Sequence, residues 1–391
     1  MNKRIYMDYS ATTPMKKEVL DAMMPYMTEH YGNASSVHSF GRDAKNAINT
    51  SREKIAKTLG ANREEVYFTA GGTESDNWAI KGIAKSMKKK GNHIITSKVE
   101  HHAVLHTCET LEKEGYEVTY LDVDEYGMIN LDDLKAAIKD TTILISIMFI
   151  NNEIGTKQPV KEIGAIAKEH GVLFHTDAVQ AYGNTPIDVN ELNIDLLSIS
   201  SHKIYGPKGI GAMYVRRGVR IGPFIDGGAQ ERKRRAGTEN VPGIVGFAKA
   251  AELAIQNMDE HIEKLTSLRE RLRDGIMGKI PYAKYNGHPT ERHPGNVNIC
   301  FEFIEGESLL LSLDLIGVAA SSGSACTSGS LDPSHVLMSI GLTHEIAHGS
   351  LRLTIGDFTT EEDVDYVIEH LVGIVDRLRQ MSPLYEAVLD K

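Results

Sequence analysis

Residues 200–203 (Ser-Ser-His-Lys) combine a primary amine with hydroxyl and imidazole groups, which can bind anions and attack carbonyl carbons. They follow an apolar run at 194–199 and precede a glycine-rich turn that leads to a second apolar run at 212–215. We therefore expect Lys203 at the mouth of a tight turn between two buried strands. Loss of hydration there would lower the pKa of the lysine, and its free amine could form an imine with an aldehyde.

Polar residues also follow other predicted strands, at the point where each strand ends. The carboxyl ends of parallel strands meet at one edge of a sheet, where α/β proteins bind their ligands. Gly72 and Thr73 begin a predicted helix, so their backbone N–H groups suit a phosphate, although the same residues are typical of a simple turn and cap. The other residues expected at this edge are His101, Asn152, Asp177, Gln180, Ser200, His202 and Lys203.

These residue types fit one cofactor better than they fit unrelated structural roles. Ser200 and His202 could add hydrogen-bond donors to the phosphate, and Asp177 could hold a proton on a pyridine nitrogen. Lys203 could form the imine. A phosphate, a ring nitrogen and an aldehyde together describe pyridoxal phosphate, whose ring withdraws electrons and makes carbanion chemistry possible.

A second chemical group lies far downstream, in the small-residue segment 321–330. Cys326 has few apolar neighbours there, whereas structural cysteines prefer an apolar core, so we interpret it as a candidate nucleophile. Cys108 and Cys300 are expected to be core or simple surface residues. The spacing of His101, His102, His106 and Cys108 offers a metal site as an alternative. We predict none, because residues 102 and 108 do not share a helix face and no second ligand cluster has zinc-like spacing.

The composition limits the classes of function. The chain has 391 residues, a formal net charge of −10 and 41% hydrophobic residues, which is typical of a globular protein and argues against nucleic acid as the main partner. No apolar run is long enough to span a membrane, and there is no apolar signal-peptide core. Three widely spaced cysteines indicate a reducing cytoplasm. The basic run at 232–235 is interpreted as a solvated loop.

Strands alternate with helices over most of the first 215 residues, which predicts parallel βαβ units and a mostly parallel sheet. A long helical region at 241–280 is expected to lead into a second, α+β domain, with strands at 297–301 and 351–355 and helices at 307–315, 334–340 and 361–379. The strands predicted for the first domain are 66–69, 93–96, 118–121, 143–149, 172–175, 194–199 and 212–215.

Eight motifs resemble those of cysteine desulfurases of the NifS/IscS type, which are class V aminotransferase-like enzymes. The resemblance covers essentially the whole chain. It implies a fold-type I, pyridoxal-phosphate-dependent α/β architecture, with a seven-stranded large domain at 14–256. It also implies a small α+β domain, formed by 1–13 and 257–391, that carries a catalytic cysteine loop at about 321–335. The motifs are at residues 9–14, 73–77, 100–101, 151–153, 175–180, 201–209, 235–240 and 321–328.

The resemblance also implies a role for each site residue. Lys203 would bond to pyridoxal phosphate and move protons, together with His101, which would stack on the ring. Cys326 would take the sulfur of the substrate, and Asn152 and Arg352 would bind its carboxylate. The residues expected to hold the cofactor are Gly72, Thr73, His101, Asp177, Gln180, Ser200, His202, Lys203 and, on the partner subunit's cofactor, Thr238.

The implied reaction removes sulfur from L-cysteine, which gives L-alanine and a persulfide on Cys326. The resemblance implies a cytoplasmic homodimer that passes sulfur to an iron–sulfur scaffold protein or another acceptor, and Cys326 could ligate a cluster transiently. No nucleic-acid or membrane partner is expected. A related pyridoxal-phosphate enzyme, such as a selenocysteine lyase or an aminotransferase, is the alternative. A non-catalytic sulfur-trafficking or metal-binding protein is a more distant one.

Overall fold

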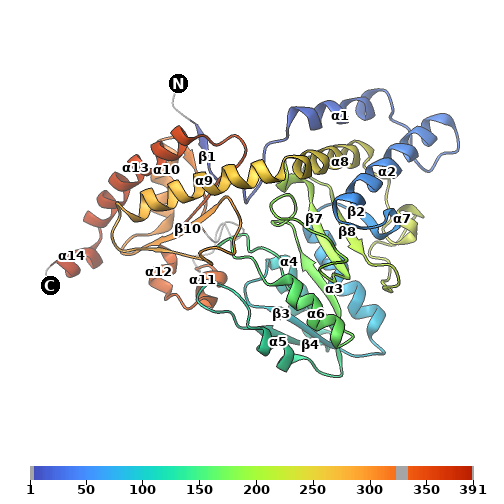
Figure 1. Ribbon diagram of the computed structural model, residues 1–391, viewed down its shortest axis with the longest axis horizontal. Helices are drawn as coiled ribbons and strands as arrows, with labels where there is room; N and C mark the ends of the chain where they lie inside the picture. Colours follow the sequence, from blue (N-terminus) through green and yellow to red (C-terminus); the bar gives the residue numbers. More distant parts are fainter. Residues whose placement is uncertain (1–3, 323–332, 390–391) are drawn as a thin grey trace.

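The computed structural model describes residues 4–322 and 333–389 (Figure 1). The chain forms two lobes, which lie at the right and the left of the view and are joined by the helices α8 (Val241–Gln256) and α9 (Met258–Met277). The large lobe is built on a seven-stranded sheet and the small lobe on a three-stranded sheet.

The sheet of the large lobe has the strand order β2-β8-β7-β6-β5-β3-β4. All neighbouring strands are parallel except β8, which runs antiparallel to both β2 and β7. The predicted mostly parallel sheet of seven strands is therefore confirmed. The strands are β2 (Val66–Thr69), β3 (His93–Ser97), β4 (Glu117–Leu121), β5 (Thr142–Ser146), β6 (Leu173–Asp177), β7 (Leu196–Ser200) and β8 (Gly211–Val215).

Helices cover both faces of this sheet, which explains why its central strands are continuous apolar runs rather than alternating ones. On one face Phe174 and Phe247 belong to a large apolar core, and on the other face Trp78 and Ile80 belong to a second one. The helices of the large lobe are α1 (Lys17–Thr28), α2 (Ser39–Thr58), α3 (Gly72–Met87), α4 (His102–Lys113), α5 (Leu131–Ala137), α6 (Val160–Glu169), α7 (Gln230–Lys233) and α8.

The small lobe has its own apolar core, formed by strand β10, helix α13 and their neighbours, with Phe301 and Leu371 among the buried side chains. Strand β1 (Ile5–Tyr6) pairs with β11 (Val318–Ala319), so the N-terminus packs on this lobe. The other elements are β9 (Ala283–Tyr285), β10 (Asn296–Phe301), β12 (Ser350–Thr354), α10 (Gly306–Leu315), α11 (His335–Ser339), α12 (His344–His348), α13 (Glu361–Gln380) and α14 (Pro383–Leu389).

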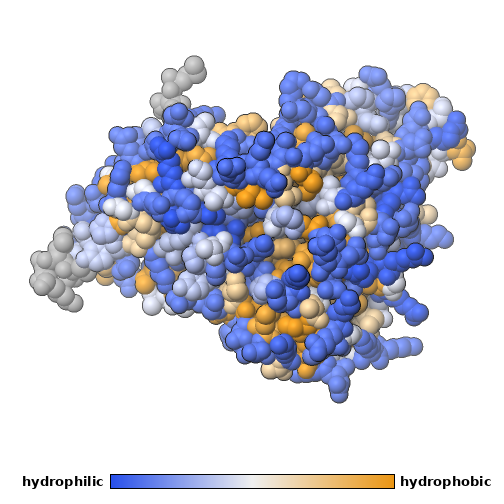
Figure 2. All heavy atoms as spheres, viewed as in Figure 1, coloured by the Kyte–Doolittle hydropathy of each residue, from blue (hydrophilic) through white to orange (hydrophobic). Residues whose placement is uncertain are grey.

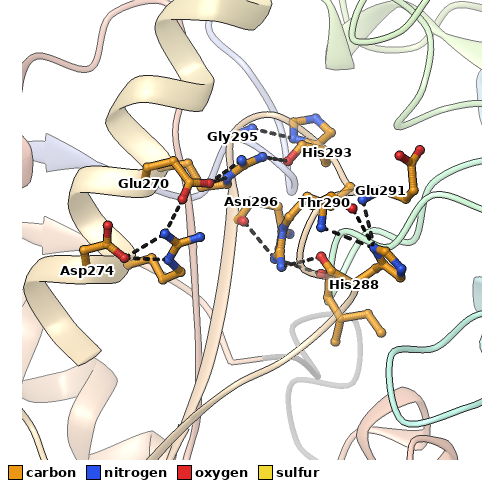
Figure 3. A network of polar contacts seen from close by, with 12 residues as sticks. Glu270, Asp274, His288, Thr290, Glu291, His293, Gly295 and Asn296 are labelled. Atoms are coloured by element: carbon orange, nitrogen blue, oxygen red, sulfur yellow. Dashed lines mark hydrogen bonds and ion pairs between the residues drawn. The ribbon is translucent and has the colours of Figure 1, made fainter. Parts of the chain in front are cut away.

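A polar network joins α9 to residues 288–296, which lead into β10 (Figure 3). The buried Arg269 of α9 pairs with Glu270 and donates a hydrogen bond to the carbonyl of His293. The imidazole Nδ1 of His293 accepts from the backbone N–H of Gly295 at 3.0 Å. These contacts fix the connection between the helix that joins the lobes and the sheet of the small lobe.

Hydrophilic residues cover most of both lobes in the view of Figure 2, with apolar patches between them. Of the helices in the described part of the chain, none has the length and apolar character needed to cross a bilayer.

Candidate active site

The start of α3 forms an open cavity of about 720 Å³, which Gly72, Thr73, Ser200 and His202 help to line. The side chain of Val179 packs directly on Gly72, because a Cβ at position 72 would lie 2.6 Å from Cγ2 of Val179. No side chain caps the N-terminus of this 16-residue helix, so its first N–H groups and its positive dipole end face the cavity. This geometry suits a phosphate group.

Ser200 and His202 reach the same cavity from the carboxyl end of β7 and from the short 3₁₀ turn at Ser201–Lys203. The ring Nδ1 of His202 lies 3.1 Å from the hydroxyl of Thr12. Burial, and then the charges of Lys203 and Lys208, lower the pKa of His202 to about 4. The imidazole is therefore neutral near pH 7 and can still donate one hydrogen bond to an anion.

Lys203 is half-buried at the end of the same turn. Its ammonium donates hydrogen bonds to the backbone carbonyls of Ser10 and Ala11, the latter at 2.9 Å. Together with Ser10 and Gln180, Lys203 lines a second cavity of about 280 Å³ at the junction of the two lobes. Gln180 also donates from Nε2 to the carbonyl of Ser10, at 3.0 Å. The N-terminal arm therefore holds both side chains.

Asp177 ends β6, and its Oδ1 accepts the backbone N–H of Val179 at 2.9 Å. Burial raises the pKa of Asp177, while the Val179 N–H and the positive charge of Lys203 oppose this rise and leave the pKa at about 6. The Val179 N–H and the charge of Lys203 therefore favour the ionised carboxyl, which can hold a cationic ring nitrogen.

His101 lies at the N-cap of α4, where its Nδ1 accepts the backbone N–H of Ala103 at 3.1 Å. This contact places the proton of the neutral ring on Nε2. Burial, followed by the charge of Lys203, lowers the pKa of His101 to about 4. Because the charge of Lys203 acts on His101, Asp177 and His202, the structure brings these four side chains into one electrostatic cluster.

The candidate carboxylate site is formed by both lobes. Arg352 of β12 is only 3% exposed and donates from Nη1 to the carbonyl of Asn152 at 3.1 Å and from Nη2 to Oδ1 of Asp8 at 2.9 Å. Asn152 belongs to a loop whose shape is set by Asn151, because the side-chain Oδ1 of Asn151 accepts the N–H groups of Glu153 and Ile154.

Asp8 and Ser10 are site residues that the sequence reasoning missed. The motif at 9–14 was recognised as part of the resemblance, but no role was given to the arm itself. The arm contacts Arg352 through Asp8 and Lys203 through the Ser10 carbonyl. Ser10 lies within that motif, whereas Asp8 lies one residue before it. The motif therefore pointed to Ser10 alone, and the contacts of both residues needed the folded chain.

The two remaining predicted site residues lie elsewhere or are not described. Thr238 lines a separate small cavity of about 60 Å³ together with Arg235 and Gly209, and Gly209 also lines the cavity at the start of α3. Cys326 lies outside the described residues. Cys108 and Cys300, in contrast, are both buried.

The basic run at 232–235 is only partly the solvated segment that was expected, because Arg232 and Lys233 are exposed whereas Arg234 and Arg235 are partly buried. The guanidinium of Arg232 stacks on the ring of Tyr67 at 3.9 Å, and Arg235 pairs with Glu74 in the first turn of α3 at 2.8 Å. The residue before this run, Glu231, is buried and pairs with Arg52 at 2.6 Å. An aromatic ring and an acidic partner elsewhere in the chain therefore bind Arg232 and Arg235, which local composition could not indicate.

The histidines considered as metal ligands are close neighbours. The rings of His102 and His106 stack at 4.8 Å, and His102 lies at the same distance from His335. Over residues 4–322 and 333–389, however, no group of three or more histidine, cysteine or acidic side chains has a metal-binding arrangement.

Known proteins with similar sequences match almost the full chain. Two are named cysteine desulfurase IscS. The protein from Methanosarcina thermophila is 63% identical and is matched over 98% of this chain and 95% of its own length. A protein from Clostridium botulinum is 60% identical, with 99% and 98% covered.

Solved structures agree with the sequence matches. A NifS-like protein superposes with a TM-score of 0.91 at 38% identity, covering 96% of this chain and all of that one. A structure described as SspA in complex with cysteine gives a TM-score of 0.82 at 39% identity, over 91% of this chain. The sequence model of the class-V aminotransferases matches residues 5–367, and the chain therefore belongs to the aminotransferase class-V family.

Proposed function

We propose that this protein is a pyridoxal-phosphate-dependent cysteine desulfurase, which transfers the sulfur of L-cysteine to Cys326 and releases L-alanine. The observation that carries the proposal is the cluster around Lys203. A lysine amine lies in the field of two neutral histidines and a buried carboxylate, beside an uncapped helix start that suits a phosphate. The near full-length similarity to proteins named cysteine desulfurase supports the same reaction.

The residues present fit the cofactor at each of its polar groups. The phosphate would be held by Gly72, Thr73, Ser200 and His202, with Thr238 reaching the phosphate of the partner subunit. Asp177 would pair with the ring nitrogen, Gln180 with the phenolic oxygen and Lys203 with the aldehyde carbon. When bound, pyridoxal phosphate supplies an electron sink that stabilises negative charge at the substrate Cα.

The protein side chains perform the other steps. Arg352 and Asn152 would orient the substrate by its carboxylate, since a guanidinium offers several donors in one plane. The amine of Lys203, in its neutral form, would take the Cα proton, and His101, with its proton on Nε2, would donate a hydrogen bond beside it. Asp177 and Arg352 are buried, which shields their charges from water and keeps these two side chains in place.

Sulfur transfer then needs a thiolate, which Cys326 would supply. Attack on the substrate sulfur forms an S–S bond and breaks the substrate Cβ–S bond. The electron pair of the broken bond stays on Cβ, which takes up a proton and becomes the methyl group of alanine. Sulfur leaves at the oxidation level of a persulfide, so no external oxidant or reductant is needed.

Two variants test the proposal. Cys326→Ala is expected to abolish sulfide release from L-cysteine in the presence of a thiol reductant, while pyridoxal phosphate still binds. Lys203→Ala is expected to lose both sulfide release and covalent binding of pyridoxal phosphate. Sulfide and alanine are measured in parallel. Full sulfide release by Cys326→Ala would favour a selenocysteine lyase or another related enzyme, and formation of a keto acid from the amino donor would favour an aminotransferase.

The partners and boundaries are also part of the proposal. We place the large domain at 14–256 and the small domain at 1–13 and 257–391, which is supported by the separate apolar cores and by the end of α8 at Asn257.

The protein would act in the cytoplasm as a homodimer, so light scattering should give twice the chain mass of 43.1 kDa. It would pass sulfur to an iron–sulfur scaffold or another acceptor, with transient cluster ligation by Cys326.

A further inference from the structure

The guanidinium of Arg352 lies in a place where a positive charge is costly. The side chain is 4% exposed, and a buried charge is tolerated only when it is paired and hydrogen-bonded. Within the described residues its ion pair is with Asp8, whose side chain is 19% exposed. Glu153 lies within its electrostatic reach, but burial raises the pKa of Glu153 to about 7, and its carboxylate accepts a hydrogen bond from Ser334 instead.

The backbone of the arm fixes Asp8 independently of this ion pair. Asp8 forms a parallel bridge with Thr354, whose N–H donates to the carbonyl of Met7 at 2.8 Å. The phenol of Tyr6 donates to the carbonyl of Asp8 at 3.0 Å. The N–H of Ser10 donates to the hydroxyl of Thr354 at 2.9 Å. The Asp8 carboxylate therefore starts from a rigid backbone, and replacing its side chain leaves these contacts in place.

Arg352 still has hydrogen-bonding capacity when these contacts are counted. Nη1 and Nη2 each have one partner, the Asn152 carbonyl and the Asp8 carboxylate, whereas the buried Nε has none among the described residues. A buried N–H without a partner is rare in folded proteins. The carboxylate of an amino acid has the charge and shape needed to accept the remaining hydrogen bonds of the Arg352 guanidinium.

We propose that Asp8 is a positioning residue, which holds the guanidinium of Arg352 in one orientation and supplies its counter-charge, so that the unused donors are presented to the substrate carboxylate. This inference rests on the proposed function. It adds a residue of the N-terminal arm to that site. The carbonyls of Ser10 and Ala11, two and three residues further along, hold the amine of Lys203, so the same arm sets the spacing between the carboxylate site and the amine.

The test compares two ligands on the pyridoxal-phosphate-loaded protein. L-alanine carries the carboxylate and L-alaninamide lacks it, and the binding of each is followed through the absorbance of the cofactor. Asp8→Ala is expected to weaken L-alanine binding about tenfold and to leave L-alaninamide binding unchanged. Asp8→Asn, which keeps a hydrogen-bond acceptor but loses the charge, is expected to give an intermediate value. With L-cysteine, the KM should rise more than kcat falls.

Two control variants, Asp195→Ala and Arg352→Lys, separate the possible outcomes. Asp195→Ala removes an ion pair with Arg216 that is more exposed than the pair of Arg352 and lies at the amino end of β7, and it should change neither affinity. Equal weakening of both ligands by Asp8→Ala, or no weakening of L-alanine, overturns the proposal. If Arg352→Lys weakens L-alanine and Asp8→Ala does not, only the role of Asp8 fails. If neither Arg352→Lys nor Asp8→Ala weakens L-alanine binding, both the role of Asp8 and the carboxylate site of the proposed function are wrong. Should Asp8→Ala not fold, Asp8→Asn carries the same comparison.

Discussion

Glu100, the residue before His101, is a buried carboxyl behind the candidate site. Its side chain accepts hydrogen bonds from the hydroxyl of Ser97 at 2.6 Å and from the backbone N–H of Met148 at 3.0 Å. Burial is the largest influence and raises the pKa of Glu100 to about 8. Near pH 7 this group is largely neutral, so it adds little negative charge beside His101 and Asp177.

This raised pKa predicts a pH dependence of stability. Between the ordinary glutamate pKa of 4.5 and a folded value of about 8, the folded state binds a proton that the unfolded state has lost. The contribution of Glu100 to stability is therefore fully present at low pH and declines as pH rises through this window, by up to about 1.4 kcal/mol per pH unit.

Glu100→Gln should remove that decline. Melting temperatures of the variant and the parent are compared at several values from about pH 5 to about pH 8. The advantage of the variant over the parent is expected to grow as pH rises. Two curves that stay parallel over the whole range would show that Glu100 is ionised in the folded protein.

At the scale of residues, the sequence predicts the Lys203 cluster because its members follow successive strands of one sheet. The placement of His101, Asp177 and Lys203 can be predicted without distant contacts, because the carboxyl ends of parallel strands lie at one edge of the sheet. The partner of Arg352 is different, because Asp8 is 344 positions away in the chain. Neither periodicity nor spacing carries information on such a contact, and only the packing of the arm on β12 reveals it.

At the scale of elements, one buried arginine ties the loop of Asn152 to the small lobe. Arg292 donates to the carbonyls of Ile154 and Asn296 at 3.1 Å each, and to the carbonyl of His288 at 3.0 Å. Its guanidinium lies 4.2 Å from the ring centre of Tyr285. The contacts with His288 and Asn296 belong to the network of Figure 3.

Arg292→Ala should destabilise the protein strongly, because several buried carbonyls would lose their donor. A loss of about 3 kcal/mol or more in the free energy of unfolding is expected. Chemical unfolding measures it. Arg271→Ala is the control: Arg271 of α9 pairs with Asp365 and Glu361 at an exposed site, where such pairs contribute at most about 1 kcal/mol. Similar losses in the two variants would contradict the role given to Arg292.

The elements themselves are predicted well where their apolar pattern is long. Helix α13 was expected at 361–379 and ends one residue later, and α10 was expected at 307–315 and begins one residue earlier. The helical region expected at 241–280 is two helices, α8 and α9, with a break at Asn257 that the continuous apolar pattern conceals. The short elements β9 and α12 were missed, because a few residues give too little periodicity to recognise.

At the scale of the whole molecule, the candidate site depends on both lobes and on the arm that crosses between them. Lys203 and Asn152 come from the large lobe, Arg352 comes from the small lobe, and the arm contacts both lysine and arginine. Lys16, just beyond the arm, adds an ion pair with Asp357 across the same junction. A change in how the lobes pack should therefore alter substrate binding and cofactor binding together.

The central claim is that the amine of Lys203 bonds to pyridoxal phosphate, and borohydride reduction tests it most directly. The loaded protein is reduced, digested and analysed by peptide mass spectrometry, with Lys203→Ala treated in parallel. The account predicts one pyridoxyl group per chain, on the peptide that contains Lys203, and none in the variant. A pyridoxyl group on another lysine, with residue 203 unmodified, would contradict the account.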